Sequence, residues 1–132
     1  MFEFSKKHKL CSQKSIRRMF DNGSAITEPP FRAVWIVESN EDGVYAKTLI
    51  NVSKKQFKFA KDRNLLKRRI REVYRLNNKN LENRLSSRKI QINLAILYNY
   101  DKILESSFMT KKINLLLSRL ITNLWGVCFH FF

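Results

Sequence analysis

The sequence predicts an α+β fold, in which a small mixed sheet of about four strands packs with three helices. Amphipathic segments alternate with runs of β-branched and aromatic residues, in the order helix, two or three strands, helix, strand, helix. At 132 residues, of which 44% are hydrophobic, the chain is long and apolar enough to bury one core. We therefore interpret residues 1–132 as a single domain.

The first helix is predicted between Ser12 and Gly23. The Ser12 hydroxyl suits an N-cap, and Gly23 is of the residue type that commonly ends a helix. Between them Ile16, Met19 and Phe20 recur at three- and four-residue spacing. This spacing places all three side chains on one apolar face.

Two strands are predicted next, over residues 31–38 and 44–52. Both segments are rich in β-branched and aromatic residues, and the polar turn at 40–43 separates them. Such a pair is typical of a β-hairpin. A short additional strand is possible at 24–27, ahead of the Pro29-Pro30 pair.

The second half of the chain predicts a long helix over residues 57–79, a polar connection, a strand over 92–100 with a lead-in from 89, and a last helix over about 105–124. The segment 113–132 is strongly apolar, but Asn114, Arg119 and Asn123 interrupt it. This pattern favours an amphipathic helix over a bilayer span of about 20 apolar residues. We expect no membrane partner, and the apolar tail 125–132 has no assigned role.

Charge is concentrated on the long central helix. The chain has 26 Lys and Arg against 11 Asp and Glu, a net charge of +15, and residues 54–75 alone contribute +8. At about 100° per residue, one arc of this helix carries basic residues around Asn64, and the other carries Phe59, Leu66, Ile70 and Val73. The basic arc suits the phosphates of a nucleic acid. A solvated structural face, or a helix lying on anionic lipid, is the alternative.

The sequence lacks the usual chemistry of a protein nuclease. His8 and His130 sit near opposite ends of the chain, and Asp62 and Glu72 stand about 15 Å apart along one helix, too far to share a metal ion. We expect helix salt links for these two carboxylates, no metal site in the protein, and no catalytic residues. The two cysteines form no CxxC pair, and the N-terminus has no apolar signal segment, which fits a cytoplasmic location.

The central segment resembles the bacterial ribonuclease P protein component. The similarity lies in NVSKK at 51–55 followed by KDRNLLKRRIREVYR at 61–75, and in RRMFDNG at 17–23 of the first helix. It extends over about residues 4–124. The resemblance implies a ribosomal protein S5 domain 2-like fold with a left-handed βαβ crossover. It also implies an accessory subunit of an endoribonuclease, in which a catalytic RNA with Mg²⁺ removes the 5′ leader of precursor tRNA.

The resemblance also implies which residues contact RNA. The expected contacts to the catalytic RNA are Lys54, Lys55, Arg63, Asn64, Lys67, Arg68, Arg71 and Arg75, while Leu65 departs from the family's RNR motif. The expected contacts to the leader are Ile16, Phe20 and Val34, of which only Phe20 is aromatic. Ordinary core packing is the alternative for Phe20, and Trp35 should point to the opposite face from Val34. No stable protein partner is expected, and a structural RNA-binding protein of the ribosomal type remains the alternative function.

Overall fold

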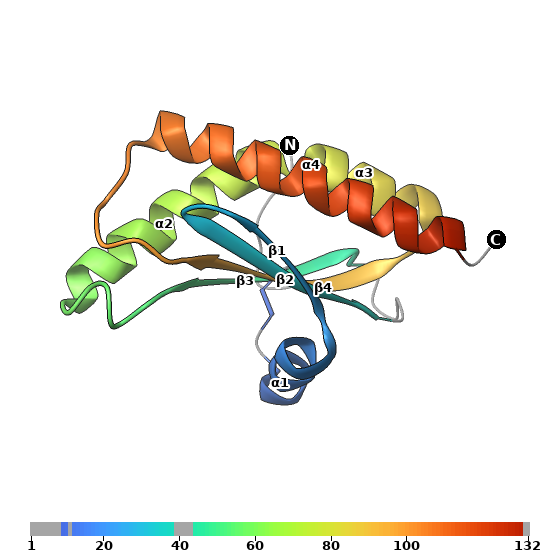
Figure 1. Cartoon of the computed structure of the whole chain (residues 1–132), viewed down its shortest axis with the longest axis horizontal. Coiled ribbons are helices and arrows are strands. Elements are labelled where there is room, and N and C mark those ends of the chain that lie inside the picture. Colours follow the sequence, from blue (N-terminus) through green and yellow to red (C-terminus); the bar gives the residue numbers. More distant parts are fainter. Residues whose placement is uncertain (1–8, 11, 39–43, 131–132) are drawn as a thin grey trace.

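The computed structural model describes residues 9–10, 12–38 and 44–130, except for the side chains of 125–130. The elements follow in the order α1 (Gln13–Asn22), β1 (Ser24–Glu28), β2 (Phe31–Glu38), β3 (Ala46–Val52), α2 (Ala60–Asn77), α3 (Lys79–Arg88), β4 (Gln91–Tyr98) and α4 (Ser106–His130). One helix, α1, covers one face of the sheet, and α2, α3 and α4 lie on the other side (Figure 1). The α+β class predicted from the sequence is confirmed.

The four strands form a mixed sheet in the order β1-β2-β4-β3. β2 pairs antiparallel with β1 and with β4, while β3 pairs parallel with β4. The predicted hairpin of β2 with β3 is therefore wrong, because β4 inserts between them and the β1–β2 pair closes through Pro29 and Pro30 instead. Burial explains this arrangement, since seven of the eight β4 residues are buried and suit a central strand. The parallel pair is joined through α2 and α3, which gives the expected βαβ unit.

Side chains alternate between the two faces of the sheet. On β2, Phe31, Ala33 and Trp35 join the large core with α2, α3 and α4, whereas Val34 joins a smaller cluster with Leu10, Met19 and Ala95 under α1. Trp35 therefore points away from Val34, as expected from the period of two. The smaller cluster is what holds α1 on its face.

The ends of α1 match the sequence prediction. The Ser15 N–H donates to Ser12 Oγ over 3.3 Å, and the Gly23 N–H donates to Met19 O over 2.8 Å. Gly23 also lies where the chain passes close to β2, because a Cβ added there would lie 2.3 Å from Met19 O and 2.6 Å from Trp35 O. Both neighbours are backbone atoms, so they cannot turn away as a side chain could.

We expect Gly23→Ala to lower the free energy of unfolding by about 1–3 kcal/mol, because the new methyl group would force α1 and β2 apart. Urea denaturation followed by circular dichroism measures this change. The exposed Asn22→Ala is the matched control and should cost no more than about 0.5 kcal/mol. Equal stability of the two variants would contradict the close contact at Gly23.

The connection after α2 contains a fourth helix, α3, which the sequence prediction treated as a polar connection. Leu81 and Leu85 pack into the core, and the helix ends at Lys89 in the left-handed conformation with φ of 55°. Only these two leucines are buried in a segment that is otherwise polar, so its sequence shows little helical periodicity of apolar residues. Phe59 is a second correction, because α2 begins only at Ala60 and the extended Phe59 is 66% exposed rather than buried.

The helix α4 runs across the sheet and is tied to the β1–β2 turn. Lys112 Nζ lies 3.4 Å from Glu28 Oε1, and Arg119 Nη1 lies 3.1 Å from Glu28 Oε2 and 2.7 Å from Thr27 O. Within the described part of the chain, no helix is long and apolar enough to cross a membrane. The tail 125–130 continues α4, whereas residues 131–132 lie outside the described residues.

Candidate nucleic-acid interface

The helix α2 has a buried side and a basic side. Leu66, Ile70, Val73 and Tyr74 are buried against the sheet and α4, and Thr48 Oγ1 of β3 donates to Tyr74 Oη over 2.9 Å. Burial raises the pKa of Tyr74 to about 12, so this contact stays uncharged at neutral pH. The contact fixes the rotation of α2 on the sheet, and with it the direction in which the basic side points.

Four residues of the basic side extend away from the core, and we call them the basic face: Asn64, Lys67, Arg68 and Arg71. Asn64 and Arg68 are exposed, and Lys67 and Arg71 are half-buried. Their spacing of three and four residues places them along one stripe of the helix. None of the four has a hydrogen-bond or ion-pair partner among the residues that the structure describes. The three charges of Lys67, Arg68 and Arg71 are therefore free for a ligand.

Three other arginines of α2 are held by the protein itself. Arg63 Nη1 donates to Phe57 O over 2.7 Å and to Lys58 O over 3.2 Å, and Arg69 Nη1 donates to Leu104 O over 2.9 Å. Arg75 forms a 2.5 Å salt bridge with Glu72, and this hydrogen bond lowers the pKa of Glu72. The Glu72 salt link was expected from the sequence. Arg63 and Arg75 thus lie beside the basic face, but each has a structural partner.

Lys54 and Lys55 lie in the turn between β3 and α2, and both are exposed. The Lys55 N–H donates to Ser53 Oγ over 3.2 Å, and the Phe57 N–H donates to Ser53 O over 3.2 Å. These bonds close the turn that leads from the edge strand into α2. The two lysines therefore extend the positive charge from the basic face toward the end of β3.

The three expected leader residues lie at α1, but they differ in exposure. Phe20 is 46% exposed, Ile16 is half-buried, and Val34 is only 4% exposed beneath the helix. Val34 therefore packs α1 onto the sheet and presents almost no surface of its own. Ordinary core packing, the alternative for Phe20, does not fit a residue with almost half of its surface exposed.

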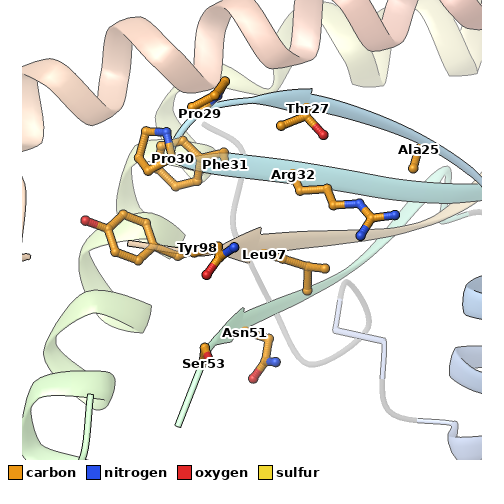
Figure 2. Close-up of a pocket in the computed structure, with 11 residues that line it drawn as sticks. Ala25, Thr27, Pro29, Pro30, Phe31, Arg32, Asn51, Ser53, Leu97 and Tyr98 are labelled. Atoms are coloured by element: carbon orange, nitrogen blue, oxygen red, sulfur yellow. The ribbon is translucent and has the colours of Figure 1, made fainter. Parts of the chain in front are cut away.

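The part of this sheet face that α1 leaves uncovered forms a groove of about 670 Å³. Figure 2 shows it between the β1–β2 turn and the end of β3, with Arg32 lying across its middle. Neither Arg32 nor Asn51 is among the site residues predicted from the sequence. The available signal was a polar residue at an alternate position in each apolar strand, Arg32 in FRAVWIVE and Asn51 in AKTLINV.

A helix face of free cations on a small α+β domain is typical of nucleic-acid-binding proteins. The family model for ribonuclease P matches residues 4–120. Over 102 residues the chain is 34% identical to the ribonuclease P protein component of Porphyromonas gingivalis, which covers 77% of this chain and 74% of that protein. The chain belongs to the ribonuclease P protein family. It is thus a protein subunit of ribonuclease P and associates with the ribonuclease P RNA.

Solved structures share the fold. The ribonuclease P protein from Thermotoga maritima is 19% identical with a TM-score of 0.65, over 84% of this chain and 96% of that one. The protein from Staphylococcus aureus is 17% identical with a TM-score of 0.63, over 86% of this chain and 94% of that one. At this identity the similarity concerns the fold, so residue roles depend on the side chains described above.

Proposed function

We propose that the basic face of α2 binds the catalytic RNA, while the α1 side of the sheet binds the single-stranded 5′ leader of precursor tRNA. The observation that carries the proposal is the set of free cationic groups on the basic face. Arg68 and Arg71 can each offer a planar fork of N–H donors to phosphate oxygens. Asn64 can donate to or accept from a ribose hydroxyl among them.

The arginines that the protein already holds have a related role in this proposal. Arg63 fixes the turn before α2 through two backbone carbonyls and keeps further N–H groups for a phosphate. Arg75, held by Glu72, extends the charged surface by one turn. Lys54 and Lys55 add two flexible charges beside them. We propose that these four residues contact the RNA at the rim of the basic face.

For the leader, Phe20 offers an exposed aromatic ring on which an unpaired base can stack. Ile16 adds apolar surface one helical turn away, and it packs against the cluster that contains Val34. Only one of these three positions is aromatic, so the surface on which bases can stack is smaller than it would be with an aromatic residue at each. The remaining affinity for the leader must then come from other groups on the same sheet face.

We propose that the chemistry belongs to the RNA subunit and that its Mg²⁺ is held there rather than by this chain. The acidic side chains near the sheet and α2 are already paired. Glu28 forms salt bridges with Lys112 and Arg119. Glu38 pairs with Arg18, and Glu72 pairs with Arg75. No group of three metal-ligating side chains comes together within the described ranges. His8 and the side chain of His130 lie outside those ranges. We propose that the working complex acts on precursor tRNA in the cytoplasm.

The test is cleavage of precursor tRNA by the cognate catalytic RNA at low Mg²⁺, with and without the protein. We expect the protein to raise the cleavage rate several-fold, because its cations replace Mg²⁺ in neutralising phosphates. At high Mg²⁺ the difference should shrink. RNA binding without any stimulation at low Mg²⁺ would favour the structural, ribosomal-type alternative and overturn the proposal.

A further inference from the structure

One cross-strand row of residues runs over the open groove, and we call it the open row: Thr27, Arg32, Leu97 and Asn51. The strand pairing sets these residues directly beside one another, with Thr27 opposite Arg32, Arg32 opposite Leu97, and Leu97 opposite Asn51. All four line the groove, and Figure 2 shows them in this order across the sheet. Since neighbouring strands are about 4.8 Å apart, the row spans roughly 14 Å.

The next row of the same face explains why the open row is accessible. It consists of Ala25, Val34, Ala95 and Leu49 in the same register. Val34 and Ala95 are buried under α1 with Met19, and Leu49 packs against that cluster. The helix α1 therefore covers the middle of this second row, and Leu97 of the open row packs against the edge of the covered cluster. A leader that binds both Phe20 of α1 and the open row would therefore lie on one face of the sheet.

The chemistry of the open row suits a polyanion with unpaired bases. Of the eleven described residues that line the groove, Arg32 alone carries a charge, and its guanidinium is exposed with no partner in the described structure. The nearest acid along the chain, Glu28, is held by Lys112 and Arg119 of α4. Leu97 gives a half-buried apolar floor, and Asn51 beside it gives an exposed amide. A volume of about 670 Å³ is within the usual range for small-molecule sites.

Resting on the proposed leader binding, we propose that Arg32 binds a phosphate of the 5′ leader, with Leu97 and Asn51 beside it receiving the adjacent base. At this site a charged side chain binds the leader where aromatic side chains would otherwise stack on its bases. Ile16 and Val34 offer no aromatic surface, whereas Arg32 offers a two-pronged donor that a phosphate can accept. Asn51 can bond either a donor or an acceptor on a base edge. Arg32 is then a positioning residue for the substrate and takes no part in the chemical step.

The experiment measures the affinity of the holoenzyme for precursor tRNAs whose leaders increase one nucleotide at a time, with mature tRNA as the leader-free ligand. For Arg32→Gln we expect about fivefold weaker binding at 0.1 M salt, since one single-strand phosphate contact contributes about 0.7 to the salt slope. The loss should appear only when the leader reaches the open row. Arg32→Lys should recover part of it, because the charge remains without the fork.

The matched control is Lys111→Gln on α4, which removes the same charge from an exposed position on the other side of the sheet. It should lower the affinity only slightly, and by the same factor for every leader length and for mature tRNA. Equal weakening of precursor and mature tRNA by Arg32→Gln, or none at all, would overturn the assignment of Arg32 while leader binding itself stands. A wild-type holoenzyme that binds precursor and mature tRNA alike would instead overturn the proposed leader binding.

Discussion

Leu66→Ala is expected to lower the free energy of unfolding by about 2–5 kcal/mol, the range for removing a fully buried leucine side chain. Leu66 is 0% exposed and lies at the centre of the contact of α2 with the core, with Ile70 one turn further along the helix. The variant leaves a cavity where the backbone of α2 cannot easily close in. Urea denaturation followed by circular dichroism measures the loss directly.

The neighbouring residue gives a matched control. Leu65 is 37% exposed on the same helix, so Leu65→Ala changes the same atoms at almost the same place without opening a buried cavity. Its effect on stability should stay within about 0.5 kcal/mol. If the two substitutions destabilise the protein equally, then α2 does not pack with Leu66 toward the core and Leu65 away from it, and the direction of the basic face would be wrong as well.

The contrast between Leu65 and Leu66 also shows what the sequence can predict. The helical period separates the two residues correctly, because burial of one face dictates which positions are apolar. The strand segments and the cap residues Ser12 and Gly23 follow from equally local chemistry. The order of the strands in the sheet cannot be predicted from local chemistry. The choice of β4 over β3 as the partner of β2 depends on contacts between segments more than 50 residues apart. The handedness of the crossover stays a prediction from the resemblance.

The candidate site also has some features that the sequence predicts and others that depend on tertiary packing. The position of Asn64, Lys67, Arg68 and Arg71 on one stripe follows from spacing alone. The engagement of Arg63 with Phe57 O could not be predicted, because it depends on how the turn before α2 folds back. The spacing of residues does not predict the place of Arg32 in a groove either, since the groove exists only where α1 leaves the sheet uncovered. Charge periodicity thus predicts a surface, whereas a concave site requires the tertiary packing.

The largest functional effect is expected from removing the three charges of the basic face together, Lys67→Ala, Arg68→Ala and Arg71→Ala. Each phosphate contact contributes about 0.7–0.9 to the slope of log K against log salt. The affinity for the catalytic RNA should therefore fall by about 100- to 500-fold at 0.1 M salt, and the slope by about two to three. Arg68→Ala alone should lower the slope by about one. Filter binding over a salt series measures both.

A protein of net charge +15 loses some affinity for RNA whenever any cation is removed, so the control must remove the same charge elsewhere. Lys79→Ala, Lys102→Ala and Lys111→Ala together do so at three exposed positions outside α2. If α2 makes the contacts, this control should change the salt slope by less than one, while thermal unfolding shows both triple variants folded. Equal slopes for the two triple variants would mean that the RNA responds to total charge, and the basic face would then have no specific role.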